Sequence, residues 1–468
     1  MGGFFGIASK EDCIGDLFYG TDYHSHLGTK RGGLAVCGPG GFVRVIHSIE
    51  NDQFRSKFDD DIAGMSGRTG IGVISDTDDQ PLLIRSHLGN YAIVTVGVIK
   101  NKEELAKRAF ETRLHFSEMS GGEISPTELI ATLINQEGTF EAGIASALDA
   151  IQGSCSLLLL TERGIYAARD KWGRTPVVVA RKDGSTAVTL ETCAFPNLGF
   201  RTEKYLGPGE VVFLTAEGYE QKTPPRDRLQ ICAFLWVYYG YPASGYEGIN
   251  VEWARNRCGA FLARRNPIAI DFVAGIPDSG IGHGLGYAAE ARVPFKRPFV
   301  KYSPTWARSF MPQSQILRDL VARMKLIPIQ ELIEGKKFLF CEDSIVRGTQ
   351  LKDTIQRLYD VGALEVHMRP ACPPLVYACK FLNFSISRSE FDLAARRAIR
   401  ELEGDHPSDL RPYAVNATEQ YNAMEEKIRR RLNLTTLKYQ RLEDLVEAIS
   451  LPKERLCTYC WDGSEPAE

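Results

Sequence analysis

Short hydrophobic runs alternate with turn residues through the first half of the chain. Residues 3–8, 92–99, 156–160 and 164–168 are apolar runs bounded by Gly, Asp or Asn, a pattern typical of strands in packed sheets. Between these runs, residues 127–135 and 142–151 have the spacing of amphipathic helices. We therefore predict a mixed domain in which sheets and helices form layers.

The pattern changes after residues 221–228, a polar segment rich in Pro and Arg that we interpret as a linker. Residues 268–276 form an apolar strand followed by Pro-Asp-Ser-Gly, and residues 337–341 form another followed by Glu-Asp-Ser. This repeated order of strand, loop and helix predicts a parallel sheet with helices on both faces. Residues 387–449 are charged and helical in pattern.

The composition narrows the class of protein. A length of 468 residues suggests about two or three domains. Hydrophobic residues make up 44% and charged residues 25%, which excludes a disordered or fibrous protein. A balance of 56 Lys and Arg against 59 Asp and Glu gives a net charge of −3, so there is no general basic field for nucleic acid.

The same sequence gives expectations about compartment. The first residues lack the pattern of a signal peptide, and no apolar run has the length of a membrane span. We therefore expect a cytoplasmic enzyme that does not bind membranes. In that compartment the eleven cysteines are expected to be free thiols or metal ligands rather than disulfides.

The most informative segment is residues 337–350, an apolar strand that leads through two acids into a turn before a helix. The acids are Glu342 and Asp343, and the turn reads Ser-Ile-Val-Arg-Gly-Thr. Acids at a strand end accept hydrogen bonds from sugar hydroxyls, while hydroxyl groups and backbone amides at a helix N-terminus bind phosphate. An acidic pair after a strand is by itself usually a surface turn. The complete segment is more specific and indicates a sugar-phosphate site.

This segment resembles the type I phosphoribosyltransferases and, among them, closely resembles the glutamine phosphoribosylpyrophosphate amidotransferase family. Residues 273–280 match the pyrophosphate loop of that family, and residues 301–326 match its mobile lid. The likeness extends over nearly the whole chain. It implies an Ntn-hydrolase-like layered α/β/β/α domain at residues 1–222. For residues 223–468 it implies a type I phosphoribosyltransferase domain with a mostly parallel sheet and C-terminal helices.

The resemblance also implies which residues form the transferase site. Those implied to bind the substrate, phosphoribosylpyrophosphate, are Asp278, Ser279, Gly280, Glu342, Asp343, Ser344, Val346, Arg347, Gly348 and Thr349. Mg²⁺ would lie between pyrophosphate and ribose oxygens, near Ser279, Glu342 and Asp343, with few protein ligands because Mg²⁺ retains waters. The first acid is Glu where the family usually has Asp.

Three cations are implied to assist catalysis from the lid. They are Lys301, Arg308 and Lys325, and in the implied role they offset the diphosphate charge and exclude water around the reacting carbon. Without the surrounding match, the same residues would be interpreted as solvated surface cations.

The same resemblance implies that the N-terminal half has lost its glutaminase chemistry. Family members begin, once processed, with a nucleophilic cysteine, and the matching residue here is Gly2. The family's carboxylate-binding arginine stretch aligns with residues 73–77, its oxyanion donors align with residues 95–97, and an acidic position is Pro126. Cys13 would become the N-terminal residue only after loss of an apolar strand. We therefore expect no ordinary glutaminase activity and interpret this half as a scaffold.

Cys457 and Cys460 form a C-x-x-C pair, which alone is compatible with zinc binding, redox exchange or no function. In the iron–sulfur branch of the family, such a pair joins one cysteine after the linker and one after a Pro-Pro segment. Cys232 and Cys379 occupy those positions. The resemblance thus implies a [4Fe–4S] cluster, with Zn²⁺ as the alternative for the same four thiols. The other cysteines, such as Cys341, are interpreted as small buried hydrophobic residues.

Two further signals are weaker. His283 follows the pyrophosphate loop and could point into the site, although a lone histidine is weak evidence. Trp236, Tyr238, Tyr239 and Tyr241 form an aromatic cluster that we interpret as core rather than as a platform for stacking bases.

Three hypotheses for function follow. The first is an amidophosphoribosyltransferase-like enzyme of purine biosynthesis that makes 5-phosphoribosylamine and pyrophosphate from ammonia rather than glutamine. The ammonia would be free or come from a separate glutaminase. The second is a phosphoribosyltransferase with another acceptor, because residues 380–384 depart from the family pattern. The third is a noncatalytic regulator that binds phosphoribosylpyrophosphate or nucleotides. The resemblance further implies purine nucleotides as inhibitors and a homo-oligomer.

Overall fold

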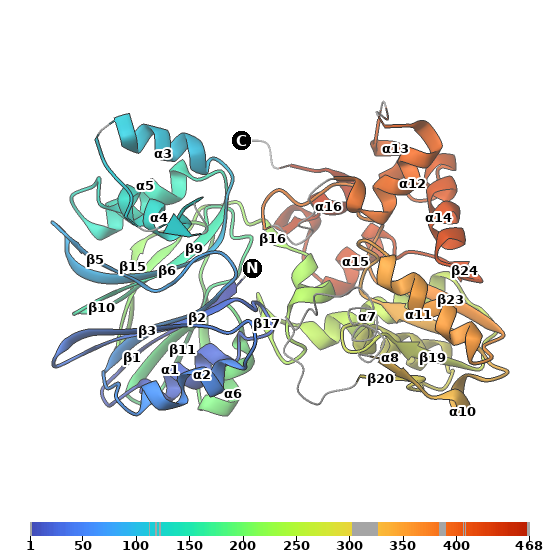
Figure 1. Cartoon of the computed structure of the whole chain (residues 1–468), viewed down its shortest axis with the longest axis horizontal. Coiled ribbons are helices and arrows are strands. Elements are labelled where there is room, and N and C mark those ends of the chain that lie inside the picture. Colours follow the sequence, from blue (N-terminus) through green and yellow to red (C-terminus); the bar gives the residue numbers. More distant parts are fainter. Residues whose placement is uncertain are drawn as a thin grey trace.

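The fold is described from a computed structural model, which covers residues 2–111, 113–117, 119–120, 123–301, 326–382, 390–405, 407 and 409–465. Figure 1 shows two units side by side, with the N-terminus at their junction. The N-terminal unit runs from β1 to β15 and the C-terminal unit from β16 to α16. In the described part of the chain, none of the helices combines the length and apolar character needed to cross a bilayer.

The first sheet of the N-terminal unit has seven antiparallel strands in the order β13-β11-β12-β1-β4-β2-β3. Their bounds are β1 Gly2–Ser9, β2 Arg31–Gly38, β3 Gly41–Ser48, β4 Thr69–Ser75, β11 Val178–Lys182, β12 Ser185–Thr189 and β13 Arg201–Tyr205. Strand β1 is central and buried along nearly its whole length. The strand predicted at residues 3–8 is therefore confirmed, and the structure places it in the middle of the sheet.

The second sheet has six antiparallel strands in the order β15-β14-β10-β9-β6-β5. Their bounds are β5 Leu82–Ser86, β6 Gly89–Ile99, β9 Gly153–Thr161, β10 Gly164–Ala168, β14 Val211–Thr215 and β15 Gly218–Thr223. The predicted linker therefore begins inside β15 and becomes irregular only after Thr223. A short pair, β7 Met119–Ser120 and β8 Glu123–Ile124, lies beside this sheet's helices.

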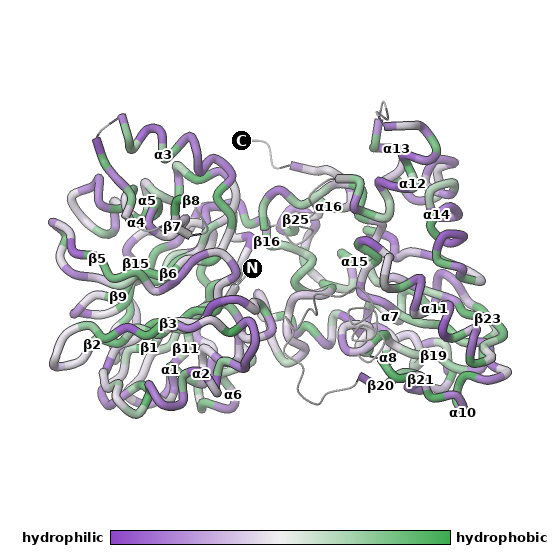
Figure 2. The backbone as a smooth tube through the Cα atoms, viewed as in Figure 1, coloured by the Kyte–Doolittle hydropathy of each residue, from purple (hydrophilic) through white to green (hydrophobic). Residues whose placement is uncertain are grey.

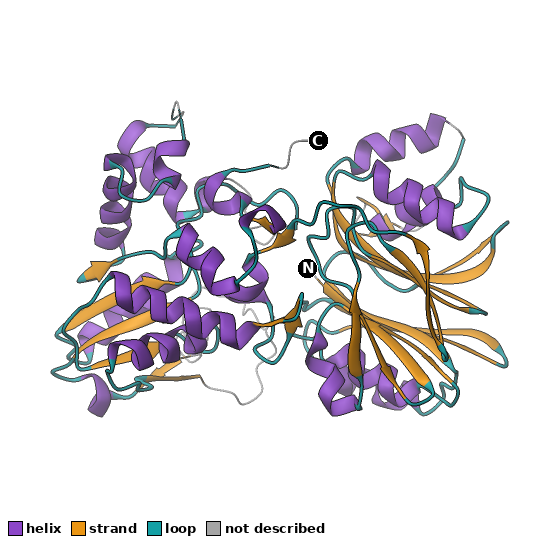
Figure 3. Cartoon of the chain, turned by 180° about the vertical axis from the view of Figure 1, so that it is seen from behind, coloured by secondary structure: helices purple, strands orange, loops and turns teal. Residues whose placement is uncertain are grey.

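Helices cover the outer faces of both sheets. On the first sheet lie α1 Ile14–Asp22, α2 Phe54–Ile62 and α6 Phe195–Leu198, and on the second lie α3 Lys102–Glu111, α4 Pro126–Ile134 and α5 Phe140–Ala150. The inner faces pack directly on each other, with Phe4 and Val188 of one sheet in the same core as Leu158 and Ile165 of the other. Figure 3 shows this stack from behind. The predicted α/β/β/α layering is confirmed.

The C-terminal unit is built on a parallel sheet in the order β19-β22-β23-β24. Its strands are β19 Phe272–Gly275, β22 Lys337–Glu342, β23 Glu365–Pro370 and β24 Thr436–Leu437, and its principal helices are α7 Val251–Arg265, α8 Gly280–Ala291, α11 Thr349–Asp360, α12 Ala394–Glu403, α14 Glu419–Arg431 and α15 Leu442–Ile449. Phe338 and Phe340 face α11 and α14, whereas Leu339 and Cys341 face α7 and α8. This alternation buries both faces of the sheet.

Two details differ from the sequence-based prediction. The strand expected at residues 268–276 is shorter, because only Phe272–Gly275 pairs with β22. The stretch expected to be helical up to residue 449 is interrupted by β24, which extends the parallel sheet. Figure 2 shows hydrophilic residues along the outer helix α14, so its charged pattern reflects one exposed face.

Smaller elements complete the C-terminal unit. They are β16 Ile231–Cys232, the π-helix η2 Leu235–Tyr239, β17 Gly245–Tyr246, β18 Ile249–Asn250, β20 Phe299–Lys301, β21 Leu326–Pro328, α10 Gln330–Ile333, α13 Arg411–Ala414, β25 Leu456–Cys457 and α16 Tyr459–Asp462. Strand β16 pairs in parallel with β25. Residues more than 200 positions apart in the chain are thereby fixed side by side at the junction between the units.

A buried carboxylate of the N-terminal unit helps to hold the two units together. Glu191 accepts hydrogen bonds from the Tyr246 hydroxyl, at 2.5 Å, and the Ser244 hydroxyl, at 3.3 Å, both of which belong to the C-terminal unit. His26 lies 2.9 Å from the same carboxylate. Removal from water tends to raise the pKa of Glu191, but these partners hold it below its ordinary value.

Candidate functional site

Two loops meet at the carboxyl edge of the parallel sheet. One follows β19 and contains Asp278 and Ser279, and the other follows β22 and contains Glu342, Asp343 and Ser344. Because β19 and β22 are adjacent, the loops lie at the edge where open parallel sheets bind their ligands. The sequence-predicted pyrophosphate and ribose loops are thus brought together.

Two hydrogen bonds fix the carboxylate of Asp343 at the centre of this edge. The Ser279 hydroxyl donates to one oxygen of Asp343, and the Ser344 hydroxyl donates to the other, each at 2.5 Å. Asp343 is buried. Removal from water raises the pKa values of both acids, and for Glu342 the neighbouring Asp343 raises it further. The pair therefore resists holding two negative charges until a cation or hydrogen-bond donor approaches.

The loops also lead into helix N-termini. Helix α8 begins at Gly280 and α11 begins at Thr349. Gly348 precedes α11 with φ +71°, a conformation that favours glycine. At Gly280, a Cβ atom would lie only 2.4 Å from the Cys341 carbonyl oxygen. Gly280 lets the two loops approach closely, and Gly348 permits the turn into α11, with both helix N-termini at the same edge.

The remaining predicted transferase residues are only partly described. Lys301 pairs with Asp278 at 2.6 Å, and both side chains are largely exposed. The Val346 carbonyl accepts a hydrogen bond from the Ala394 amide at 2.7 Å, which ties the loop to α12. Arg347 is exposed. Arg308 and Lys325 lie outside the described residues.

Arg255 is a neighbour of this site that sequence reasoning missed. It is buried on α7 and donates to the carbonyl oxygens of Trp236, Tyr238 and Gly240. Its positive charge acts to lower the pKa of Asp343. No local motif marks such a residue, because its partners lie in another element.

The prediction that His283 could point into the site is wrong. The imidazole is buried, and its Nε2 lies 3.2 Å from the Val237 carbonyl oxygen of η2. Burial and the nearby Arg255 lower the pKa of His283 to about 3. The aromatic cluster is core only in part, because Trp236 is buried whereas Tyr238 and Tyr241 are each nearly half exposed. Tyr241 contacts the His26 ring across the junction.

In the N-terminal unit, Gly2 pairs with Ser75 across β1 and β4. A Cβ atom on Gly2 would lie 2.1 Å from the Ile74 carbonyl oxygen, so this backbone arrangement leaves no space for a side chain. Cys13, the alternative nucleophile, is buried, and its burial raises the pKa of the thiol to about 12. A thiolate is the reactive form of cysteine, so Cys13 is poorly placed to replace a missing nucleophile.

A closed set of hydrogen bonds lies in and beside the segments expected, from the sequence resemblance, to correspond to the family's glutamine site. We call it the Asp78 network; its members are Ser75, Thr77, Asp78, Gln80, Thr95, Ser125 and Thr127. One Asp78 oxygen accepts from Thr77 and Gln80 at 2.7 Å, and the other accepts from Ser125 at 2.7 Å and the Thr127 amide at 3.1 Å. Gln80 in turn accepts from the Thr95 amide.

The Asp78 network satisfies its own buried polar groups. Ser75, Asp78, Gln80 and Thr95 are all buried. Val96, at the position expected to match the family's oxyanion donor, is also buried, and its side chain has no hydrogen-bond donor. The polar side chains of the network bind one another, and its one charged member, Asp78, has both carboxylate oxygens engaged in these hydrogen bonds.

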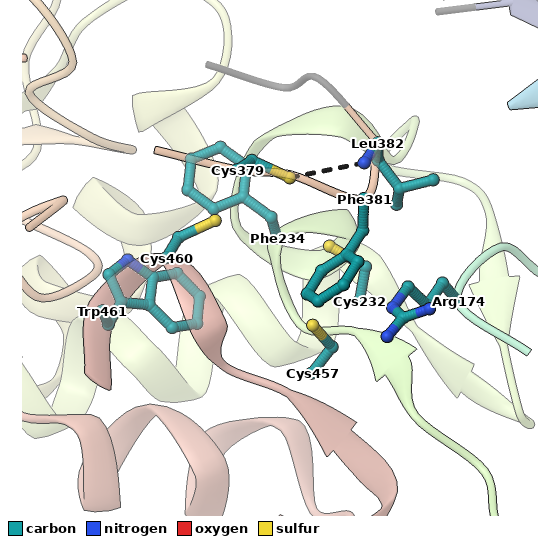
Figure 4. Close-up of a pocket in the computed structure, with 9 residues that line it drawn as sticks. All are labelled: Arg174, Cys232, Phe234, Cys379, Phe381, Leu382, Cys457, Cys460 and Trp461. Carbon is teal, nitrogen blue, oxygen red and sulfur yellow. Dashed lines mark hydrogen bonds between the residues drawn. The ribbon is translucent and has the colours of Figure 1, made fainter. Parts of the chain in front are cut away.

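The four predicted cysteines line one cavity at the junction of the units (Figure 4). The described residues around it are Arg174, Cys232, Phe234, Cys379, Phe381, Leu382, Cys457, Cys460 and Trp461. Strands β16 and β25 present Cys232 and Cys457 side by side. The Leu382 amide donates to the Cys379 sulfur at 3.4 Å. Sequence reasoning therefore identified four side chains that the fold gathers from three separate segments.

The spacing of these thiols bears on what they could hold. Within the described residues, no three His, Cys, Asp or Glu side chains converge closely enough to hold a metal ion as they stand. A tetrahedral zinc ion requires its sulfurs about 3.8 Å apart, given Zn–S bonds of about 2.3 Å. Four thiols without histidine or carboxylate, set among aromatic rings, are the soft ligands that iron–sulfur clusters and zinc prefer.

Comparisons with known proteins cover the whole chain. A model of the glutamine amidotransferase domain matches residues 67–196. An amidophosphoribosyltransferase of Mycobacterium bovis is 30% identical over 480 residues, covering 100% of this chain and 86% of that protein. The amidophosphoribosyltransferase of Methanocaldococcus jannaschii is 29% identical, covering 100% and 98%.

Solved structures agree. Glutamine phosphoribosylpyrophosphate amidotransferase from Bacillus subtilis, complexed with ADP and GMP, superposes with a TM-score of 0.85 at 27% identity, covering 100% of this chain and 97% of that one. A structure described as the allosteric regulatory enzyme of purine biosynthesis gives a TM-score of 0.85 at 26% identity. The two-unit architecture described above is therefore shared with these enzymes over its full length.

Proposed function

Because the chain belongs to the amidophosphoribosyltransferase family, we propose that it transfers an amino group from ammonia onto phosphoribosylpyrophosphate, giving 5-phosphoribosylamine and pyrophosphate in purine biosynthesis. One contrast carries this proposal. The loops of the transferase site converge on Asp343, whereas the polar groups at the aligned glutamine site bind one another in the Asp78 network.

The substrate roles follow from the geometry of the loops. Asp343, Glu342 and Ser344 would hold the ribose and its phosphate, and Ser279 with Gly280 would approach the pyrophosphate. Mg²⁺ fits this edge, because the oxygens of Ser279, Glu342 and Asp343 are the ligand type it prefers. When bound, Mg²⁺ would neutralise part of the diphosphate charge. Thr349, Gly348 and the N-terminus of α11 then offer backbone donors to the phosphate.

Of the three lid cations, only Lys301 lies among the described residues. Lys301 already pairs with Asp278, so substrate binding would exchange this partner for a pyrophosphate oxygen. We assign Arg308 and Lys325 the same charge-offsetting role on the basis of the family match. Arg255 would act indirectly, since it holds η2 and contributes positive potential near Asp343.

Three features support ammonia rather than glutamine as the donor. Gly2 has no nucleophile and its backbone leaves no room for one. The Asp78 network ties together the groups of the aligned amide site. Cys13 is buried with a raised pKa. Free ammonia, or ammonia from a separate glutaminase, would therefore reach the transferase site without help from this unit.

We also propose that Cys232, Cys379, Cys457 and Cys460 hold a [4Fe–4S] cluster with a structural role, with Zn²⁺ as the alternative. Support comes from the shared cavity, its aromatic lining and the amide that donates to the Cys379 sulfur. A cluster has a larger core than a single ion, and this matches thiols that surround a cavity without meeting at one point.

The remaining parts of the proposal concern organisation and regulation. Residues 1–222 would serve as the scaffold and residues 223–468 as the transferase, in a cytoplasmic homo-oligomer. The related Bacillus subtilis structure contains ADP and GMP, which supports purine nucleotides as inhibitors here.

Pyrophosphate release tests the proposed function. The anaerobically purified protein, Mg²⁺ and phosphoribosylpyrophosphate would be combined with ammonium, with glutamine or with neither. Release with ammonium only supports the proposal. Equal release with glutamine would overturn the assignment of the N-terminal unit, and binding without turnover in any mixture would identify a regulator instead of an enzyme.

A further inference from the structure

Arg174 is the one residue of the N-terminal unit among the nine described residues that line the four-cysteine cavity. It is also the one permanently charged side chain among them. The residue is only 2% exposed. Within the described part of the chain it has no carboxylate partner, and burying an arginine in this way is costly, so its position beside four thiols requires an explanation.

The guanidinium is held by contacts that leave part of it unused. Its carbon lies 3.7 Å from the centroid of the Phe381 ring, and Nη1 donates to the Gly153 carbonyl oxygen at 3.0 Å. The buried Nε has no hydrogen-bond partner among the residues that the structure describes. Figure 4 shows the guanidinium beside Phe381, in the half of the cavity that contains Cys457. One buried donor thus remains available at the edge of the cavity.

The main chain around Arg174 contacts the segment that carries one of these cysteines, Cys232. The Arg174 carbonyl oxygen accepts a hydrogen bond from the Cys232 amide at 3.1 Å, and the Trp172 carbonyl accepts from the Gln230 amide at 2.7 Å. Cys232 pairs with Cys457 through β16 and β25. A single loop of the N-terminal unit therefore positions the strand pair that carries two of the four thiols.

We infer that Arg174 is a positioning residue for the metal–thiolate group: it offsets the negative charge of the group from the N-terminal side and orients Cys232 and Cys457. This inference rests on the proposal that the four cysteines bind a metal group. Four thiolates exceed the positive charge of a zinc ion or of an iron–sulfur core, so the loaded cavity carries net negative charge. Arginine suits this position because it remains charged when buried and donates from a planar face.

The inference gives the N-terminal unit a role other than glutamine hydrolysis. Binding of the metal group would strengthen the docking of the two units. The negative charge that attracts Arg174 is present in the C-terminal unit only when the metal–thiolate group is present. Conversely, a displaced loop would expose the group to solvent. Partners outside the direct ligand set typically contribute 10- to 100-fold to metal retention.

The test compares Arg174→Gln, Arg174→Lys and wild type in full-length protein purified without oxygen. Iron, acid-labile sulfide and zinc are quantified first. The rate at which the metal is lost is then followed, by visible absorbance in air for a cluster or with a chelating dye for zinc. We expect Arg174→Gln to lose metal at least about 10-fold faster than wild type, and Arg174→Lys to fall between them because it keeps the charge but lacks the planar face.

Arg181→Gln is the matched control, since Arg181 is an exposed arginine on β11 of the same unit. Equal loss rates for wild type, Arg174→Gln and Arg174→Lys would overturn the inference. If Arg174→Gln does not fold, the comparison of Arg174→Lys with wild type decides, because equal rates there contradict the inference. If the wild-type protein contains no metal, the metal proposal is overturned and the inference with it. If the wild-type protein contains metal and the Arg174 variants lose it at the wild-type rate, only the inference is overturned.

Discussion

Ser279 donates a hydrogen bond of 2.5 Å to Asp343, and so joins the loop after β19 to the loop after β22. The two residues are 64 positions apart. Ser344 holds the other Asp343 oxygen, so the carboxylate is oriented from both sides before any ligand binds. Such preorganisation favours binding and catalysis because the protein does not have to reorder its polar groups during the reaction.

Replacing this carboxylate should abolish most transferase activity. We expect Asp343→Asn to lower kcat/KM for phosphoribosylpyrophosphate at least about 100-fold, because a preorganised charge at the reacting sugar is lost. Initial rates of pyrophosphate release with ammonium provide the measurement. Asp353→Asn, at an exposed position on α11, is the control and should retain activity. A small effect at Asp343 would exclude it from the substrate site.

Restoring the family nucleophile should not restore glutaminase activity. We expect Gly2→Cys to release no glutamate from glutamine, because the Asp78 network still occupies the aligned amide site. The added side chain should also lower the free energy of unfolding by about 1–3 kcal/mol, since its Cβ meets the Ile74 carbonyl.

Gly138→Cys is the matched control for that variant, because a Cβ at Gly138 meets nothing within 4 Å. Glutamate assays and denaturant unfolding of both variants complete the comparison. Measurable glutamate release by Gly2→Cys would show that the site retains its catalytic groups.

The Asp78 network should contribute to stability rather than to catalysis. In Asp78→Asn, an NH₂ group replaces one carboxylate oxygen. In either orientation of the amide, this group faces hydrogen-bond donors that the lost oxygen had accepted from. An unsatisfied buried group costs about 1–3 kcal/mol, so the unfolding free energy should fall by that amount. Ammonium-dependent kcat should remain unchanged. Asp79→Asn, next in the chain but largely exposed, should be close to wild type in both measurements.

Stability should fall in mild acid because of buried histidines. Burial lowers the pKa of His24 to about 4 and that of His283 to about 3. The unfolded chain takes up protons below about pH 6.5, while the folded chain does not. The free energy of unfolding is therefore highest above pH 6.5. It decreases as pH falls toward 4, by about 1.4 kcal/mol per pH unit for each histidine.

His24→Gln isolates one of these contributions. Its unfolding free energy, measured by denaturant titration between pH 4.5 and 7.5, should depend less steeply on pH by about 1.4 kcal/mol per unit. Above pH 7 the curves for variant and wild type should be parallel. An unchanged slope in acid would mean that His24 titrates normally in the folded protein.

Much of the fold was predictable because its signals are local. The buried strand β1, the helix α4 and the strand-loop-helix order around Glu342 each follow from apolar periodicity and turn residues. The family resemblance grouped Ser279 with Glu342 and Asp343, and their loops do lie together because adjacent parallel strands present their carboxyl ends on one edge. Their family match supplied the substrate, which periodicity alone does not.

Other features depend on contacts that no local pattern contains. Arg174 resembles any loop arginine in the sequence, and only the fold brings it against Phe381 and the cysteines. His283 follows the pyrophosphate loop, but its Nε2 lies against the Val237 carbonyl oxygen of η2, a contact between segments far apart in the chain. The Asp78 network joins residues from three segments, so its closure is a tertiary property.

Nitrogen tracing tests the central claim most directly. The protein would receive phosphoribosylpyrophosphate and Mg²⁺ with ¹⁵N-ammonium and unlabelled glutamine, or with amide-¹⁵N-glutamine and unlabelled ammonium, and the trapped phosphoribosylamine would be examined by mass spectrometry. We predict label in the product from ammonium alone and no glutamate in either mixture. Label from the glutamine amide, accompanied by glutamate, would contradict the account.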